Sequence, residues 1–305
     1  MPRYPDRPAV TDGGLETDLI FHGGVEMPHF AAFPLVETSD GRALLDHYFA
    51  RYATIAARAG VAVMLETPTW RASADWGDKL GYTPAALAGL NESAVALMAE
   101  VGERHAETDV IVGGTVGPRG DGYRPEFLMT PDEAAEYHAP QVDAFARAGA
   151  AVVTAYTLTD AGEAIGFVRA ARAAGLPVAV SFTVETDGRL PTGATLAEAV
   201  TTVDEAGGPD YFLVNCAHPQ HIEPALTEPG AWRERVAGLR CNASTRSHAE
   251  LDEAEQLDEG DPQSLAAGVA ALHDSFPNLS IVGGCCGTDA RHVAAMWRVE
   301  LPVPA

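Results

Sequence analysis

The sequence predicts an α/β fold in which eight parallel strands, each followed by a helix, close into a barrel. Three observations predict it: short runs rich in β-branched residues recur along the whole chain, longer segments with helical spacing separate them, and polar residues follow almost every run. Such runs are typical of strands buried on both faces, as in a parallel sheet. A length of 305 residues suits one domain, residues 1–305, since barrels of this kind take about 250 residues.

The predicted strands cover residues 9–12, 61–65, 110–114, 151–155, 177–182, 211–214, 239–241 and 280–284. An open, doubly wound sheet uses the same alternation and is the competing fold. The polar residues after the strands favour the barrel, because there all the strand ends converge on one rim, the face where active sites are built. We therefore expect a (β/α)8 barrel of the TIM type.

Helix boundaries follow from local signals between the strands. Apolar residues recur on one helical face over residues 44–55, and Gly60 ends that helix. Thr130, with Glu133 three residues later, predicts a helix start, and residues 288–289 offer a cap for the last helix.

The segment 242–262 interrupts this rhythm. It contains seven acidic residues and no apolar periodicity. We interpret it as an acidic loop within the domain, solvated or acting as a lid over the rim.

Composition excludes several classes of function. A formal net charge of −23 argues against nucleic acid and anionic membranes as partners. The first ten residues lack the apolar core of a signal peptide, and no stretch reaches the roughly 18 apolar residues of a membrane span. We therefore expect a cytoplasmic protein whose partners are small molecules, and the sequence leaves a homo-oligomer open.

Three of the four cysteines stand at strand ends that a barrel brings together. Cys216 ends the sixth strand, and Cys285 with Cys286 ends the eighth. Only the seventh strand lies between them, so their thiolates can meet in one mouth. Cys241, in the seventh strand, is expected to pack in the barrel, because cysteine often serves as a small buried hydrophobe.

Three thiolates at one place predict a catalytic zinc site. Tetrahedral zinc with Zn–S bonds of about 2.3 Å needs sulfurs about 3.7 Å apart, and three protein ligands leave the fourth position open. Glycines on both sides of the vicinal pair permit the sharp turn that this spacing requires. Three thiolates make the metal a poor activator of water but leave a bound substrate thiolate nucleophilic. The ligand set therefore favours alkylation of sulfur over hydrolysis.

These motifs resemble the homocysteine S-methyltransferase family, whose members are zinc-dependent barrels. The resemblance covers about residues 12–298 and rests on Asp12-Gly13-Gly14-Leu15-Glu16-Thr17, Thr69-Trp70-Arg71-Ala72-Ser73, Ser181-Phe182-Thr183, Asn215-Cys216-Ala217-His218-Pro219 and Gly283-Gly284-Cys285-Cys286-Gly287-Thr288. It implies that Cys216, Cys285 and Cys286 are the zinc ligands. It also implies that Asp12 and Gly13 lie beside the amino acid end of the thiol substrate.

The chain departs from the family pattern at three places. Tyr156 stands where members usually place a glutamate after the fourth strand to hold the amino group of homocysteine. Pro68 replaces the asparagine or aromatic residue of the second-strand motif, and residues 242–248 replace a proline–asparagine turn after the seventh strand. These departures leave the metal chemistry intact and bear on the identity of the acceptor.

The expected reaction is methylation of a thiol, homocysteine or a related one, from an onium methyl donor. Metal binding would deprotonate the thiol, so no separate general base is needed. Trp70 and Tyr156 are candidates to hold the donor cation on their aromatic faces. Asp12 is the candidate to orient a substrate amine, and Asn215 is a further candidate substrate contact.

Three alternatives stay open at this point. The acceptor is a different thiol or a selenol, for which Tyr156 is the main argument. Alternatively, the vicinal cysteines serve a non-catalytic metal-sensing or redox-sensing role. The third alternative is a metal-free barrel that binds a small molecule.

Overall fold

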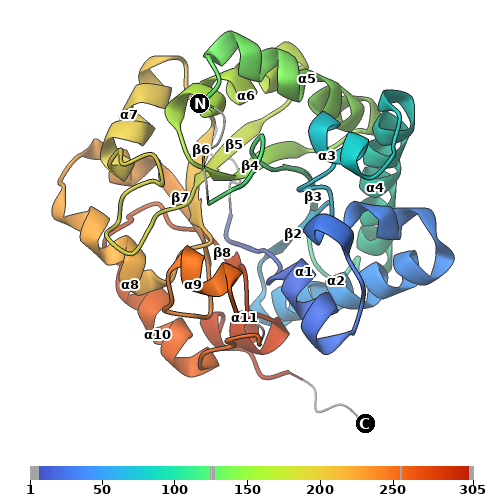
Figure 1. Ribbon diagram of the computed structural model, residues 1–305. Coiled ribbons are helices and arrows are strands. Elements are labelled where there is room, and N and C mark those ends of the chain that lie inside the picture. The colour runs from blue at the N-terminus through green and yellow to red at the C-terminus, as the bar shows by residue number, and fades with distance from the viewer. Residues whose placement is uncertain (1–6, 124, 126–127, 255, 302–305) are drawn as a thin grey trace.

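In the computed structural model, which describes residues 7–123, 125, 128–254 and 256–301, parallel strands pair in chain order and close into a barrel (Figure 1). The strands are β1 (Ala9–Val10), β2 (Ala62–Glu66), β3 (Val110–Val116), β4 (Val152–Leu158), β5 (Val178–Phe182), β6 (Tyr211–Asn215), β7 (Val236–Cys241) and β8 (Ile281–Gly284). β1 pairs with both β2 and β8, which completes the ring. The predicted (β/α)8 barrel is confirmed.

All eight strands lie where the sequence predicts them, and two boundaries differ by three residues. β4 ends at Leu158 rather than at residue 155. β7 begins at Val236 rather than at residue 239. Its first residues include alanine and glycine, which signal a strand weakly. Gly238 is nevertheless suited to its place, because a Cβ there would lie 2.5 Å from the side chain of Leu213 on β6.

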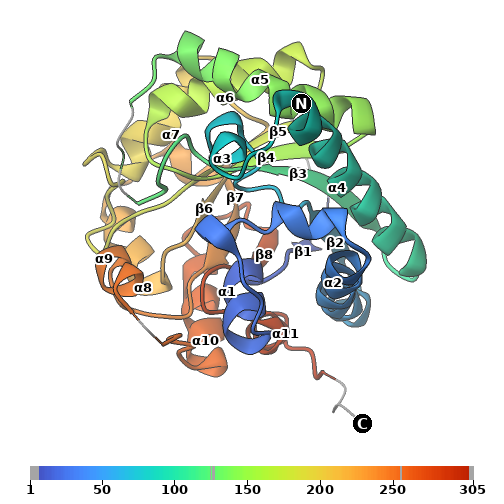
Figure 2. The same ribbon diagram turned by 45° about the vertical axis from the view of Figure 1, so that its right-hand side comes forward.

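Helices form an outer ring around the strands, as Figures 1 and 2 show. The helices of this ring are α2 (Ser39–Ala59), α4 (Pro84–Arg104), α5 (Pro131–Ala148), α6 (Ala161–Ala173), α7 (Leu196–Glu205), α8 (Pro219–Ile222), α10 (Pro262–His273) and α11 (Ala290–Met296). The shorter helices α1 (Leu15–Thr17), α3 (Ala74–Lys79) and α9 (His248–Asp252) belong to the loops that follow β1, β2 and β7. Among the described helices, none combines the length and apolar composition needed to cross a membrane.

The predicted helix signals act as expected. Thr130 caps α5 with a complete capping box that includes Glu133, and Gly60 ends α2 in the left-handed conformation with φ 69°. Asp289 caps α11 by accepting a hydrogen bond from the amide of Arg291. These local bonds set the ends of the helices and hence the lengths of the loops at the rim.

The barrel interior is filled from alternate positions of the strands. Met64, Tyr211, Leu213 and Ile281 are almost completely buried and belong to one cluster. Tyr156 belongs to the same cluster but also borders the rim. The interior is thus a packed core closed below the rim, and the space for ligands lies at the carboxyl ends of the strands.

The acidic segment, residues 242–262, contains helix α9, which the sequence pattern did not predict. Ser247 caps this helix with a capping box that includes Glu250. Leu251 and Leu257 face the pocket at the rim rather than solvent alone. The segment therefore contributes apolar side chains to the mouth of the barrel despite its charge.

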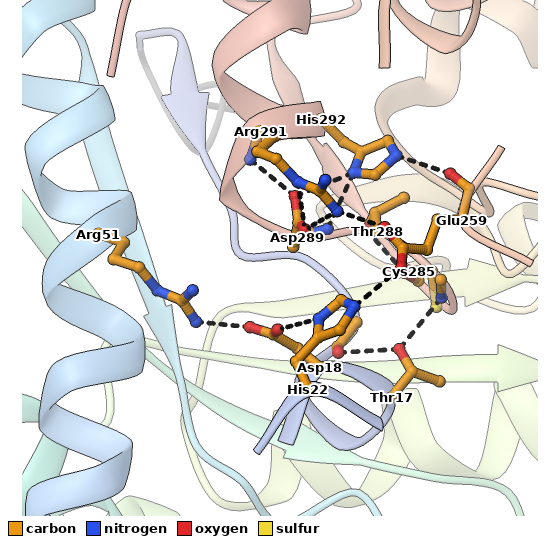
Figure 3. Close-up of polar contacts among 12 residues, drawn as sticks. Thr17, Asp18, His22, Arg51, Glu259, Cys285, Thr288, Asp289, Arg291 and His292 are labelled. Atoms are coloured by element: carbon orange, nitrogen blue, oxygen red, sulfur yellow. Dashed lines mark hydrogen bonds and ion pairs between the residues drawn. The ribbon is translucent and has the colours of Figure 1, made fainter. Parts of the chain in front are cut away.

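A chain of ion pairs ties the acidic segment to the turn after β1 (Figure 3). Asp18 accepts hydrogen bonds from Arg51 of α2 at 2.5 Å and from Nδ1 of His22 at 2.8 Å. Nε2 of His22 lies 3.0 Å from Oε1 of Glu259 in the acidic segment. The contacts with Glu259 and Asp18 raise the pKa of His22 above 6.5.

Helix α11 holds the same glutamate from the other side. Arg291 pairs with the carboxylate of Glu259 and with Asp289, and Nε2 of His292 lies 2.8 Å from the backbone oxygen of Glu259 (Figure 3). The acidic segment is therefore anchored at Glu259 by two elements that flank the strand ends.

Close packing of α5 on α6 gives a first testable consequence. A Cβ on Gly166 of α6 would lie 2.4 Å from the Cβ of Ala134 on α5. We expect Gly166→Ala to lower the free energy of unfolding by about 1–3 kcal/mol through overpacking. The matched control is Gly89→Ala in α4, where a Cβ meets no atom within 4 Å, and we expect it to raise that free energy by about 0.5–1 kcal/mol. Urea denaturation measures both, and equal effects would contradict the packing.

The anchor at His22 predicts that attachment of the acidic segment depends on pH. The pKa of His22 is raised in the folded protein. The attraction between His22 and the carboxylates of Asp18 and Glu259 is therefore fully present at pH 6.5 and is lost as the pH rises through the folded pKa. The His22 side chain is 36% exposed, so we expect only about a twofold to fivefold fall in hydrogen-exchange protection of residues 256–260. His22→Gln should abolish this pH dependence, whereas His105→Gln, at a distant exposed ion pair, should keep it. A pH dependence that survives His22→Gln would refute the anchor.

Candidate metal centre and substrate pocket

Two strand ends bring three thiols together. Cys216 directly follows β6, and Cys285 and Cys286 directly follow β8. Their Sγ atoms all lie within 4.8 Å of one another, and those of Cys216 and Cys286 are 4.0 Å apart. These three residues form the cysteine cluster. Cys241 stands apart in the packed core and is completely buried, as expected from the sequence.

Cys216 reaches the cluster through an uncommon backbone conformation. Its φ is 53°, in the left-handed region that residues other than glycine rarely adopt. Four hydrogen bonds hold it there: its amide donates to the oxygen of Arg240, and its oxygen accepts from Asn242 at 3.0 Å, from His248 at 2.7 Å and from Thr183 at 3.4 Å. Strain of this kind persists only where surrounding contacts determine the conformation, and it concentrates at functional sites.

The glycines around the vicinal pair are required by close contacts. A Cβ on Gly284 would lie 1.9 Å from Oγ1 of Thr288, the hydroxyl that donates to the backbone oxygen of Cys285. Gly287 has φ 77°, and its amide donates to Oγ1 of Thr17 at 3.1 Å. These contacts turn the chain sharply after β8 and point both sulfurs toward Cys216.

Each sulfur of the cysteine cluster has a polar neighbour. Oγ1 of Thr157 lies 3.9 Å from Cys216, Nδ2 of Asn215 lies 3.9 Å from Cys285, and Oη of Tyr123 lies 3.7 Å from Cys286. Tyr123 in turn stacks on His248, with ring centroids 4.0 Å apart. Sequence analysis predicted Asn215 but none of Tyr123, Thr157 and His248.

The three thiols do not ionise independently. Hydrogen bonds from Cys285 and Cys286 lower the pKa of Cys216 well below its usual range. The same contacts with Cys216 raise the pKa of Cys285 to about 12 and that of Cys286 further. Three buried thiolates this close repel one another, so ionisation of all three needs a compensating cation. This is the electrostatic condition that a divalent metal satisfies.

Beside the cysteines lies a buried group of opposite charges, the acid–arginine cluster of Asp12, Glu66 and Arg240. The guanidinium of Arg240 donates to Asp12 at 2.5 Å and to Glu66 at 2.7 Å. It also donates to the backbone oxygens of Gly13 at 3.1 Å and Gly284 at 3.0 Å. Four of its five N–H groups are thus used inside the protein.

Burial dominates the electrostatics of both carboxylates in this cluster. It raises the pKa of Asp12 and raises that of Glu66 to about 7, while Arg240 opposes both shifts. Tyr156 donates its hydroxyl to Glu66 at 2.6 Å, and Tyr48 donates to Asp12 at 3.2 Å. The pair of acids is therefore already provided with donors by the protein itself.

A single pocket of about 410 Å³ joins the two clusters. All eight residues predicted from the sequence as metal or substrate contacts line it: Asp12, Gly13, Trp70, Tyr156, Asn215, Cys216, Cys285 and Cys286. Phe21, Phe30 and Tyr123 add aromatic surface to the same pocket. Arg240 also lines it, and its position inside a predicted buried strand was the sequence signal that could have identified it.

The two aromatic residues predicted to hold a cation already contact cations of the protein. The guanidinium of Arg240 lies 4.8 Å from the ring centroid of Tyr156, and that of Arg71 lies 4.9 Å from the ring of Trp70. The indole of Trp70 donates to the backbone oxygen of Tyr156 at 3.4 Å. One face of each ring is thus occupied, and both residues belong to one wall of the pocket.

Comparisons with known proteins agree with this geometry. A family model described as homocysteine S-methyltransferase matches residues 9–299. The homocysteine S-methyltransferase YbgG of Bacillus subtilis (strain 168) is 27% identical over 209 residues, which cover 63% of this chain and 62% of that protein. The chain thus matches somewhat less than two thirds of the length of this relative.

Solved structures show the same fold. The homocysteine methyltransferase MmuM from Escherichia coli, in its metallated form, aligns over 96% of both chains with a TM-score of 0.74 and 21% identity. Its oxidized form aligns over 95% of both chains with a TM-score of 0.75 and 19% identity. A protein of this fold has therefore been solved with metal, and the cysteine cluster described above could hold one.

The family model spans nearly the whole chain and includes the three clustered cysteines. YbgG and MmuM are both named as methyltransferases. The chain belongs to the homocysteine S-methyltransferase family.

Proposed function

We propose that this chain is a zinc-dependent S-methyltransferase that methylates a thiol, homocysteine or a related one, from an onium methyl donor. The observation that carries the proposal is the cysteine cluster, whose sulfurs from two strand ends meet within 4.8 Å at a pocket. Family membership supports thiol methylation in general. The thiolate ligand set supports the choice of zinc, and the aromatic lining of the pocket supports a cationic donor.

The donor set fits zinc. Tetrahedral zinc with three thiolates needs sulfurs about 3.7 Å apart, and the 4.0 Å between Cys216 and Cys286 is close to this. Soft thiolate ligands select zinc over hard cations such as magnesium or calcium. When bound, zinc would keep an acceptor thiol ionised at neutral pH, well below the free thiol pKa of about 8.5.

The protein side chains then orient the ligands. Thr157, Asn215 and Tyr123 each place a donor group near one sulfur of the cysteine cluster. Such contacts fix ligand orientation and temper the negative charge on sulfur. His248 donates from Nε2 to the backbone oxygen of Cys216, and its Nδ1 lies 3.1 Å from Oε1 of Glu185. Its ring supports that of Tyr123 by stacking.

The walls of the pocket suit transfer of a methyl group from a cation. The acceptor sulfur forms the new bond to the methyl carbon, the bond from that carbon to the onium atom breaks, and its electron pair stays on the donor, which becomes neutral. The thiol proton leaves to solvent before this step. Aromatic rings such as Trp70 and apolar side chains such as Leu257 limit access of water to the pocket.

The predicted substrate contacts remain part of the proposal. Trp70 and Tyr156 form one wall beside the cysteines, and Gly13 leaves room at the turn after β1. Asp12 and Asn215 line the pocket while their side chains are bound within the protein. We infer that these two act chiefly by holding Arg240 and the sulfurs in place.

Removing one cysteine tests the metal centre. We expect Cys285→Ala to lose bound zinc and to lower kcat/KM for thiol methylation at least about hundredfold, since a metal site with one fewer thiolate binds far more weakly. Elemental analysis and a methyl-transfer assay with homocysteine as acceptor, across a panel of onium donors, measure the two effects.

Cys241→Ala is the matched control, because Cys241 is a buried cysteine outside the cluster. It should keep zinc and activity while losing some stability to the small cavity. Full zinc content and activity in Cys285→Ala, or loss of zinc in both variants alike, would contradict the proposed metal centre.

A further inference from the structure

One carboxylate in the pocket forms no ion pair with any residue that the structure describes. Glu16 of α1 lines the pocket. Among the described residues, the only hydrogen bond to its carboxylate comes from its own backbone amide. Burial raises the pKa of Glu16 to about 7, and the neighbouring charges of Asp12 and Cys285 act in the same direction. Glu16 is half-buried at the pocket, so its carboxylate is accessible to a ligand of opposite charge.

The other two buried acids of the pocket are not available in the same way. Arg240 donates to both Asp12 and Glu66, and the hydroxyls of Tyr48 and Tyr156 add a further donor to each. The guanidinium lies between these carboxylates, in the place where a cationic group of a ligand would otherwise bind. A ligand cation that entered there would have to displace a saturated, buried arginine.

Arg240 compensates Glu16 only weakly. No hydrogen bond or ion pair joins Arg240 to Glu16, and the side-chain carboxylates that Arg240 binds are those of Asp12 and Glu66. Four of its N–H groups already bind other atoms. The negative charge of Glu16 is therefore free to act on the contents of the pocket.

The rest of the lining suits an organic cation. Phe21, Phe30, Trp70 and Tyr123 line the same pocket as Glu16. Aromatic faces together with one carboxylate are the groups that bind ammonium and sulfonium centres, because the ring quadrupole and the charge both attract a cation. Hard metal ions prefer several oxygen ligands gathered at one point, and among the described residues Glu16 belongs to no group of three or more potential metal ligands.

We propose that Glu16 binds the positively charged group of a substrate and thereby determines which substrates the enzyme accepts. The inference rests on the proposed function, because that reaction supplies two sources of an organic cation. One is the ammonium group of an amino acid thiol, and the other is the onium centre of the methyl donor. In either case Glu16 binds the substrate cation, because Asp12 and Glu66 already bind Arg240.

Calorimetric binding to the zinc-loaded protein tests the inference and separates the two sources. The probes are L-homocysteine, 4-mercaptobutanoate, which is the same thiol acid without the ammonium group, and dimethylsulfoniopropionate, which carries a sulfonium but no ammonium. The variants are Glu16→Gln, which removes the charge, Glu16→Asp, which keeps it, and Glu26→Gln, a control at an exposed glutamate outside the pocket.

If the acceptor is the source, Glu16→Gln weakens binding of homocysteine at least about tenfold and leaves that of 4-mercaptobutanoate within about twofold, as expected for loss of one charge-assisted hydrogen bond. If the donor is the source, the same variant weakens dimethylsulfoniopropionate about tenfold and spares both thiols. Glu16→Asp should retain part of the affinity that Glu16→Gln loses, and Glu26→Gln should match the wild type.

The inference is overturned if Glu16→Gln changes the affinity for neither cationic probe by more than about twofold, or if the wild type binds none of the three. Methyl transfer, assayed in parallel, separates this result from failure of the proposed function. If the wild type transfers methyl groups and Glu16→Gln leaves the affinities for both cationic probes unchanged, only the role of Glu16 is refuted. If Glu16→Gln weakens binding of dimethylsulfoniopropionate or homocysteine but the wild type transfers no methyl group, only the proposed reaction is refuted. Circular dichroism confirms that the variants fold.

Discussion

The arrangement of the strand ends at the rim of the barrel depends on one buried arginine. Arg240 lies on β7, between the two strands that carry the cysteine cluster, and its charge is compensated by carboxylates that follow or end β1 and β2. A buried ion pair contributes little net stability, but removing one partner leaves an uncompensated charge and costs about 3–5 kcal/mol. The contacts of Arg240 with Asp12, Glu66 and Gly284 therefore fix where β1, β2 and β8 end relative to one another.

This constraint separates two electrostatic regions within one pocket. In the acid–arginine cluster, two carboxylates surround one guanidinium, and each carboxylate also accepts a hydrogen bond from a tyrosine hydroxyl. In the cysteine cluster, no cationic side chain lies between the sulfurs among the described residues, and three thiolates within 4.8 Å would repel one another. Because Arg240 is held by the acids, the cation that the thiolates need has to come from a ligand such as a metal ion.

The parts of the molecule that the sequence predicts are those with local signals. The β-branched runs predict the strands, and the cysteines at the ends of the sixth and eighth runs predict the cluster, because a barrel brings the ends of its strands to one rim. Asn215 is found in the same way, as a polar residue beside Cys216. Gly60 and Thr130 mark helix ends through their own backbone and side-chain preferences.

The residues that sequence analysis missed depend on contacts between distant segments. Tyr123 reaches Cys286 from a loop, and its position depends on stacking against His248, which lies far along the chain. Arg240 and Glu66 belong to separate strands, and only the closed barrel brings them together. The acidic segment has the composition of a loop, yet α9 forms there because Ser247 and Glu250 cap each other and Leu251 contacts the pocket. That capping box is a local signal from which α9 could have been predicted, whereas the contacts of Tyr123 and Arg240 depend on the folded barrel.

The turn after β1 connects the pocket with the acidic segment, residues 242–262. Glu16 faces the pocket, and two residues further on Asp18 begins the chain of ion pairs that passes through His22 to Glu259 of the acidic segment. Arg51 holds Asp18 from α2, so the turn is braced from behind by a long helix of the outer ring (Figure 3). The anchor of the acidic segment at Glu259 and the carboxylate of Glu16 therefore depend on one continuous stretch of chain, α1 followed by the helical turn Asp18–His22. This stretch directly follows the carboxyl end of β1, and Arg51 of α2 holds it at Asp18.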